Sequence, residues 1–318
     1  MLRTIGTKLL LIIPVLFIVS LGTFLLVELV PGDPAIQVLG PNSTAEEYER
    51  VREEMGLNDP VIERYWNWLS DALHGDLGYN LVPPSTPVWD RLANAFPINI
   101  ELAALALIMS FAISIPLAMW SAYRAGGRFD RTVSATMFGV ISVPSFLAGI
   151  ILLLIFAINW RIFPLGQWAR PTEEGWGANL KHAFLPAFTL ALTEIAVFTR
   201  LLRNDLMATL QDDFILAARA KGMTPRHIMV REALRPSSFS LITLAGVSLG
   251  RLIGGTVIVE TIFALPGIGR LLIGAILTRD LIILQGVVLL VGAGFVIINF
   301  IVDLLYAVLD PRIRHGHA

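Results

Sequence analysis

The chain has 318 residues, of which 55% are hydrophobic and only 15% are charged, and its formal net charge is −1. Soluble globular domains carry about 25% charged residues, so this composition indicates a protein whose surroundings are lipid. The near-zero net charge gives no reason to expect a nucleic acid partner. The sequence contains no cysteine, which excludes disulfides, thiolate metal sites and a cysteine nucleophile.

Six apolar stretches are long enough to cross a bilayer, whose core of about 30 Å needs roughly 20 helical residues. The first follows Arg3 and Lys8 but is too long for a typical signal peptide, and no small-residue cleavage site follows it, so we expect a retained span. The sequence therefore predicts an all-α polytopic membrane protein with six transmembrane helices. The six stretches are residues 9–30, 98–120, 133–158, 183–202, 237–263 and 281–309.

Lysine and arginine are concentrated in alternate loops. Arg124, Arg128 and Arg131 lie between the second and third spans, and a dense basic group runs from Arg200 to Arg235 between the fourth and fifth. Because short cytoplasmic loops are enriched in these residues, this distribution predicts a multi-pass protein of the plasma or inner membrane with both termini in the cytoplasm.

Residues 31–97 are the acidic part of the chain and are predicted to lie outside the cell as an extracytoplasmic segment. Ser43 or Thr44 can start a helix that runs to about Met55, with Gly56 at its end. A second helix can start after Pro60. Its aromatic residues have two interpretations, an interfacial belt or contacts to a ligand. They are Tyr65, Trp66 and Trp68.

Proline and glycine inside the spans predict kinked and closely packed helices. Three prolines lie within spans, where neighbouring helices can satisfy the freed backbone groups. The fifth span has two overlapping G-x-x-x-G units, which favour close helix packing and also allow a moving contact. The prolines are Pro14, Pro116 and Pro144, and the glycines are Gly246, Gly250 and Gly254.

The charged stretch between the fourth and fifth spans has the signals of two short helices, and we call residues 213–236 the basic insert. Asp212 or Asp213 can start a helix over 214–221, and Gly222 can end it in the left-handed conformation. Thr224 and Pro225 then start a second helix, which should end at Arg235, before Pro236. A solvated basic loop that obeys the positive-inside rule is the alternative interpretation.

The small residues of the basic insert resemble a known motif. The pattern A-A-x-x-x-G at Ala217, Ala218 and Gly222 is similar to the EAA loop of ABC importer permeases, and ARAKG at 218–222 resembles their dipeptide and oligopeptide branch. Pro236 and Ser240 depart from that branch, which usually has asparagine and proline at these positions. Other stretches similar to its B-type membrane subunit are LVPGDPA at 29–35, GLNDP at 56–60, GDLG at 75–78, GGTVIVETIFALPGIGRLL at 254–272 and DLLYAVLDPRI at 303–313.

The resemblance implies the type I ABC importer permease fold, with the first span in residues 1–30, the extracytoplasmic segment in 31–97 and the core permease domain in 98–318. The loop 200–236 would contain the coupling helix that docks on a cytoplasmic ATPase. Implied partners are a second, similar permease, two ATP-binding subunits or domains, an extracytoplasmic substrate-binding protein and membrane lipid. The implied ATPase-coupling residues are Asp213, Phe214, Ala217, Ala218, Arg219, Lys221 and Gly222.

The chain itself is not expected to hydrolyse ATP, because it has no G-x-x-x-x-G-K-[ST] phosphate loop. We therefore expect no cofactor in this chain, with ATP and magnesium bound by the partner ATPase. The resemblance implies peptides as cargo, and related importers of nickel, haem and glutathione leave those cargoes open.

Charged residues inside spans indicate a passage or a salt bridge, because each costs about 2.5–3.5 kcal/mol at a helix centre on insertion scales. Glu194 and Arg251 could line the pathway or pair between helices. On a straight helix Arg251 and Glu260 lie on opposite faces and could not pair. Glu260 begins a stretch with Pro266 and Gly267 that resembles the outer gate of the family.

Two other classes of protein fit the sequence less well. A secondary transporter driven by protons through Glu194 and Glu260 would usually have more spans or an inverted repeat, and would have no use for the basic insert. An intramembrane hydrolase would need a base beside a mid-membrane serine. The histidines lie outside the spans or at an edge, at His74, His182, His227, His315 and His317.

Overall fold

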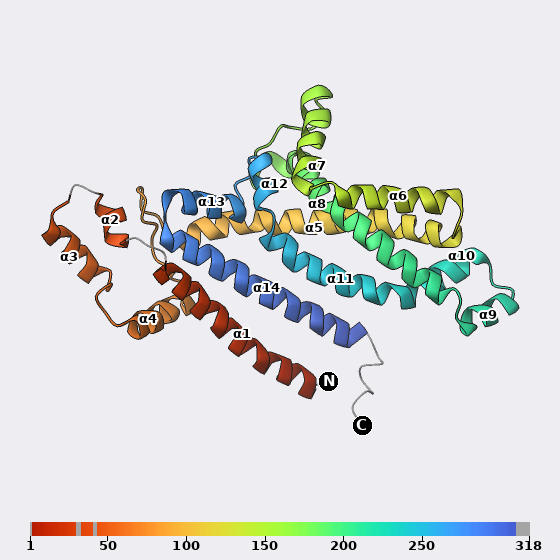
Figure 1. Cartoon of the computed structure of the whole chain (residues 1–318), viewed down its shortest axis with the longest axis horizontal. Helices are drawn as coiled ribbons and strands as arrows, with labels where there is room; N and C mark the ends of the chain where they lie inside the picture. Colours follow the sequence, from red (N-terminus) through yellow and green to blue (C-terminus); the bar gives the residue numbers. More distant parts are fainter. Residues whose placement is uncertain (1, 30–32, 41–42, 310–318) are drawn as a thin grey trace. The chain divides into compact units, whose positions relative to one another are not determined.

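The computed structural model of the chain describes residues 2–29, 33–40 and 43–309. Within these ranges the chain is helical apart from its connections and one isolated β-bridge, between Tyr79 and Pro87 (Figure 1). The predicted all-α class is confirmed. The chain divides into two compact units. The N-terminal unit contains Leu2–Asn99 and Pro266–Ile297, and the core unit contains Ile100–Leu265 and the chain from Ile298 onward.

Five of the six predicted spans contain a single helix that is long and apolar enough to cross a membrane. The predicted span 133–158 is kinked, as Pro144 indicates, because α6 (Arg128–Ser142) and the helical stretch Ser145–Asn159 meet at a 100° bend. The bend lies at Pro144, which disfavours a helical conformation in the residue before it. Val143 is accordingly extended, with ψ 122°. The apolar helices are Leu10–Leu29, Val88–Tyr123, Pro171–Thr209, Pro225–Gly254 and Leu281–Val302.

The N-terminal unit begins with α1 (Leu2–Leu29), α2 (Pro34–Leu39), α3 (Ala45–Glu54) and α4 (Val61–Leu73). Thr44 caps α3 as predicted, and it forms a capping box with Glu47. The backbone N–H and the hydroxyl of Thr44 both donate to the Glu47 carboxylate. These hydrogen bonds, the backbone one having the larger effect, hold the pKa of Glu47 below its ordinary value. Gly56 follows in the left-handed conformation, with φ 63°.

The aromatic residues of α4 pack against α1 within this unit. Tyr65 is buried, and its hydroxyl lies 2.9 Å from the Ser20 hydroxyl. The rings of Trp68 and Phe24 are 5.8 Å apart. Neither interpretation made from the sequence therefore describes Tyr65, because its ring and its hydroxyl are both used to join α4 to α1.

The rest of the N-terminal unit joins α13 (Ile268–Thr278) to the first turns of α5 (Val88–Tyr123) and α14 (Leu281–Leu309). Asp280 is buried, and its carboxylate accepts the backbone N–H groups of Leu81 at 3.0 Å and Ile283 at 3.2 Å. The apolar side chains form one cluster. Its buried members are Val88, Leu92, Ala95, Ile268, Ala275, Ile283 and Val287.

The core unit is organised around α8 (Pro171–Thr209), which packs against α6, α7 (Ser145–Leu152) and α11 (Leu234–Gly254) (Figure 1). Gly175 breaks α8 near its start, with φ 83°. The remaining elements are the π-helix Leu153–Asn159, α9 (Asp213–Ala220), α10 (Pro225–His227), the π-helix Ile228–Ala233 and α12 (Val257–Ile262).

The predicted close packing of the fifth span is found at Gly246. A Cβ atom at this position would lie 2.2 Å from Cγ1 of Val302 on α14, so only glycine allows the two helices to approach this closely. The predicted span 237–263 is too long, because α11 ends at Gly254 and α12 starts separately at Val257. Two adjacent glycines, Gly254 and Gly255, lie at this break.

Candidate functional site

The basic insert folds as two short helical segments joined at a glycine, as predicted. Asp212 is the N-cap residue of α9, and its backbone is extended, with φ −70° and ψ 151°. Lys221 ends the helix, and Gly222 has φ +78°, in the left-handed region that favours glycine. Thr224 then caps α10, since its hydroxyl accepts the backbone N–H of His227 at 3.4 Å. In Figure 1 α9 and α10 lie at one end of α8 and α11.

The boundary predicted at Arg235 is wrong. From Pro225 the helical chain continues through the π-helix Ile228–Ala233 into α11, which contains Pro236. A proline lacks the N–H that an α-helix would use, and it crowds the preceding turn. The π-helix ends at Ala233, shortly before Pro236, and its different backbone hydrogen-bond pattern accommodates the proline. The second segment of the insert and the fifth span therefore form one continuous helical element.

The two faces of α9 have different surroundings. Ile215 and Ala218 are buried in an apolar cluster with residues of α5, α8 and the π-helix 228–233, among them Phe198 and Leu202. Ala218, one of the implied ATPase-coupling residues, is therefore not available to a partner, because its side chain packs inward. Ala217 is exposed. The outward residues of the predicted set are Asp213, Phe214, Ala217, Arg219, Lys221 and Gly222.

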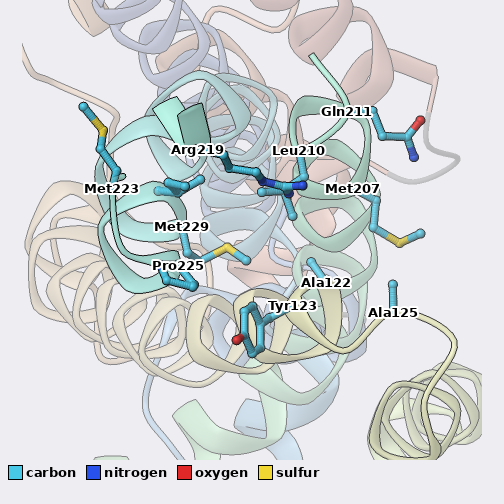
Figure 2. Close-up of a pocket in the computed structure, with 11 residues that line it drawn as sticks. Ala122, Tyr123, Ala125, Met207, Leu210, Gln211, Arg219, Met223, Pro225 and Met229 are labelled. Atoms are coloured by element: carbon cyan, nitrogen blue, oxygen red, sulfur yellow. The ribbon is translucent and has the colours of Figure 1, made fainter. Parts of the chain in front are cut away.

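Arg219 lines a hollow between the insert and the ends of α5 and α8. The cavity has a volume of about 540 Å³, and it is lined mainly by apolar side chains and methionines. Figure 2 shows the Arg219 side chain extending toward Leu210 of the chain itself. Arg219 therefore differs from Lys221, which does not line this hollow. The other lining residues are Ala122, Tyr123, Ala125, Met207, Gln211, Met223, Pro225, Ile228 and Met229.

The charged residues of the spans form an ion pair between α8 and α11. Glu194 is 2% exposed, and it accepts hydrogen bonds from Ser248 Oγ at 2.7 Å and from Arg251 Nη2 at 2.5 Å. The side chain of Arg251 is nevertheless 62% exposed. The structure therefore brings Glu194 and Arg251 together, with the carboxylate inside and the guanidinium at the surface of the chain.

Arg251 belongs to a stripe along α11 that the chain leaves exposed. From Pro236 onward the exposed residues of α11 are Pro236, Ser240, Val247 and Arg251. At 3.6 residues per turn these positions share one face. Lipid-facing helices carry large apolar residues, as the exposed Phe146, Leu147, Ile150 and Leu154 do in the bent third span. The α11 stripe has one such residue, Val247, which is 49% exposed and lies between Ser240 and Arg251 in the sequence.

The predicted gate residues lie in a turn after α11. Glu260 is fully buried, and its carboxylate accepts a hydrogen bond from the Thr256 hydroxyl. The Leu265 N–H donates to the Glu260 carbonyl at 2.8 Å, which closes the turn. Pro266 follows, and Gly267 is the N-cap residue of α13. Glu260 belongs to the core unit and Pro266 and Gly267 to the N-terminal unit.

A second polar link holds this turn within the core unit. The backbone N–H of Gln167 donates to the Phe263 carbonyl at 3.1 Å. A Cβ atom on Gly166 would lie 2.4 Å from that same carbonyl oxygen. The connection before α8 therefore touches the turn after α12 through a position that only glycine can occupy.

The residues that sequence reasoning missed are Asp130 and Arg203. Asp130 is 3% exposed, and its carboxylate accepts hydrogen bonds from Arg203, from the Ser121 hydroxyl at 2.5 Å and from the Gly126 N–H at 2.8 Å. In the sequence Arg203 is one of the basic residues between Arg200 and Arg235, and nothing sets it apart from the others. The signal available was one acid, Asp130, between Arg128 and Arg131 in an otherwise basic loop.

No group of three or more metal-ligating side chains occurs among the residues that the structure describes. Residues 114–315 match the family described as "Binding-protein-dependent transport system inner membrane component", and residues 1–103 match the N-terminal family of such membrane components. The chain belongs to this family. The resemblance drawn from the motifs is thereby confirmed, and the chain is a multi-pass inner membrane component of such a transport system.

Relatives of this membrane component match nearly its whole length. A putative peptide transport system permease protein of Brucella abortus (strain 2308) is 38% identical over 305 residues, 95% of this chain and 96% of its own. A probable peptide ABC transporter permease protein of Sinorhizobium fredii (strain NBRC 101917 / NGR234) is 36% identical over 303 residues, with coverage of 95% and 96%. The dipeptide transport system permease protein DppB of Escherichia coli (strain K12) is 32% identical over 338 residues, with 99% of both chains covered.

Solved structures support the fold of this membrane component. Two inward-facing crystal forms of the MetNI methionine ABC transporter match it with TM-scores of 0.53 and 0.57. Each is 17% identical in sequence, and the match covers 69% of this chain and 96% of the other. The predicted type I ABC importer permease fold is confirmed.

Proposed function

We propose that this chain is the B-type permease subunit of an ATP-driven importer of peptides. In this proposal it pairs with a second, similar permease in the membrane, and two ATP-binding subunits or domains supply the energy. A substrate-binding protein delivers peptides from outside. The names of the relatives support the peptide cargo, because proteins named as peptide and dipeptide permeases match 95–99% of this chain.

The geometry of α9 is the observation that carries the coupling part of the proposal. A short helix is fixed from behind by Ile215 and Ala218, and it exposes Phe214 and Ala217 on its other side. Phe214 is 44% exposed and Leu216 is 56% exposed, so this short helix leaves two large apolar side chains uncovered. A cytoplasmic ATPase that covers this surface explains both the rigid inner face and the apolar outer face.

The continuous helix from Pro225 to Gly254 would carry motion from this contact into the membrane. ATP-driven closure of the ATPase pair would move α9, and the helical connection through the π turn would move α11 with it as one body. Alternating access then results from rigid-body movement of the spans. This direction of force requires the basic insert and both termini to lie in the cytoplasm, as the distribution of arginine and lysine indicates.

Arg251 and Glu194 would line the passage, and Glu260, Pro266 and Gly267 would form the outer gate. An arginine that faced lipid at this depth would cost about 2.5–3.5 kcal/mol on insertion scales. The exposed stripe with Ser240 and Arg251 is therefore better explained by a water-filled path or by the second permease than by lipid.

Uptake measurements on membrane vesicles test the proposal. With the complete set of partners present, uptake of a radiolabelled dipeptide should depend on ATP and persist when a protonophore collapses the proton gradient. Uptake that survives ATP depletion and stops with the protonophore would instead support a proton-coupled transporter. Mass spectrometry of the ligand on the co-purified binding protein then identifies the cargo, and nickel, haem or glutathione there would overturn the peptide assignment.

A further inference from the structure

The ion pair of the spans is asymmetric in a way that a purely structural pair does not require. The carboxylate of Glu194 is buried, and both of its oxygens are used, one by Ser248 and one by Arg251. The guanidinium of Arg251 gives Glu194 one Nη2 contact, and its side chain is 62% exposed. Among the described residues Glu194 is the only acid paired with Arg251.

The geometry holds the guanidinium in a fixed position while leaving donors available. A guanidinium has five N–H donors in a planar fork, and it can bind a carboxylate through two parallel hydrogen bonds. Glu194 lies near the middle of the predicted span 183–202, so its partner Arg251 lies at depth in the membrane region. A preorganised cation at this depth, on a face where Val247 is the one large apolar side chain among the exposed residues from Pro236 to Gly254, is suited to a small anionic group that passes through.

We infer that Arg251 is a binding subsite for the carboxylate at the C-terminus of the transported peptide, with Glu194 and Ser248 as positioning residues. The inference rests on the proposed function, because it assumes that peptides pass along the exposed stripe of α11. Every peptide with a free C-terminus carries this carboxylate whatever its side chains, so a single arginine can contact cargo of varied sequence.

Glu194 partly neutralises the charge of the Arg251 guanidinium, which also suits a site that binds its cargo only briefly. A passage must bind its cargo well enough to admit it and weakly enough to release it. An unpaired arginine at this depth would attract the carboxylate strongly, whereas a guanidinium that already shares its charge with Glu194 attracts it less. Ser248 fixes the second oxygen of Glu194, which keeps the carboxylate from rotating toward the passage.

The test compares one peptide in two forms, with a free C-terminal carboxylate and with a C-terminal amide. The complete complex is reconstituted in vesicles, and both peptides are supplied at concentrations that saturate the binding protein. The measured quantity is the ratio of the maximal uptake rates per complex (kcat) for acid and amide. Because the binding protein is the same in every experiment, a change in this ratio between permease variants reports on the permease.

Arg251→Gln should lower the acid-to-amide ratio about tenfold, which is the size expected for losing a hydrogen-bonded contact to a charged group. Arg251→Lys keeps the charge without the planar fork and should give an intermediate ratio. Lys181→Gln is the matched control, because it removes a positive charge at an exposed position of α8 outside the predicted span. The ratio should not change in this control.

A second variant distinguishes the loss of a binding contact from misassembly of the complex. Arg251→Gln alone leaves a buried carboxylate unpaired, whereas Glu194→Gln combined with Arg251→Gln removes both charges. The double variant should show the same lowered ratio. An unchanged ratio in either variant overturns the inference, and so does loss of assembly in both, which would assign the pair to packing alone. Absence of ATP-dependent uptake of either peptide by the unaltered complex contradicts the proposed function instead.

Discussion

The guanidinium of Arg203 on α8 is paired side by side with the carboxylate of Asp130 on α6. Nε lies 2.5 Å from Oδ1, and Nη2 lies 2.7 Å from Oδ2. Asp130 also accepts the Ser121 hydroxyl and the Gly126 N–H, so one carboxylate joins the end of α5, the turn after it, α6 and α8. Because α8 leads directly to α9, this cluster fixes the base on which the basic insert rests.

Removing one partner of this pair should strongly destabilise the core unit. Asp130→Asn removes the buried carboxylate that pairs with the half-buried Arg203 side chain, and breaking a buried pair costs about 3–5 kcal/mol. We expect a clear fall in the thermal unfolding midpoint of the purified complex. The double variant Asp130→Leu with Arg203→Met should recover most of that loss, because neither charge remains. A single variant that is more stable than the double variant would refute this explanation.

The contact between Gly246 and Val302 predicts a steric effect that can be reversed. Gly246→Ala places a Cβ atom 2.2 Å from Val302 Cγ1, so α11 and α14 must move apart. Overpacking of this kind costs about 1–3 kcal/mol. Adding Val302→Ala in the same chain should restore most of the lost stability. Rescue by the second substitution, measured as a thermal unfolding midpoint, separates a steric cause from a change in helix propensity.

Gly166→Ala should disturb the turn that carries the gate residues. Its Cβ would lie 2.4 Å from the Phe263 carbonyl oxygen, which also accepts the Gln167 N–H. The backbone on one side must shift, and we expect a loss of about 1–3 kcal/mol in stability together with reduced uptake. Gly139→Ala on α6 is the control, because no atom lies within 4 Å of its added Cβ. Equal effects of the two substitutions would show that the contact with Phe263 is unimportant.

The positive φ of Gly222 gives a prediction about coupling. A Cβ at this position meets no atom within 4 Å, so any effect of substitution comes from the backbone, whose φ is +78°. Gly222→Val should distort the turn, since the left-handed conformation costs a residue with a Cβ about 1–2 kcal/mol and is an outlier for a branched one. Gly222→Asn should be tolerated. We expect ATP-dependent uptake to fall with valine and to remain with asparagine, at equal amounts of protein in the membrane.

Local signals in the sequence predicted much of this structure. The Thr44 cap, the glycine end of α9 and the apolar lengths of five spans depend on neighbouring residues, and the structure has them where the sequence indicates. Pro144 predicts a kink in the third span, but the 100° size of the bend does not follow from the sequence, because hydropathy measures length and not direction. Two other features, the inward face of Ala218 and the pairing of Asp130 with Arg203, depend on contacts between distant segments that a single sequence does not reveal.

Arg251 and Glu194 illustrate the same limit. Each was recognised from its charge within an apolar stretch, which needs only hydropathy. The sequence leaves two interpretations of these residues open, namely that they line the pathway or that they pair between helices. The expected geometry of Arg251 and Glu260 assumed a straight helix, but the helix breaks at Gly254, so that argument does not apply to the folded chain.

Site-specific cross-linking at α9 tests the central claim, that this helix docks on an ATPase. The chain contains no cysteine, so single cysteines can be introduced without removing any. Ala217→Cys lies on the exposed face and Ala218→Cys on the buried face, and Leu277→Cys on α13 is an exposed control at 78%. With a thiol-directed photo-cross-linker in the assembled complex, the account predicts cross-linking to the ATPase from position 217 alone. A complex that transports peptide while position 217 gives no cross-link to the ATPase in any nucleotide state would contradict it.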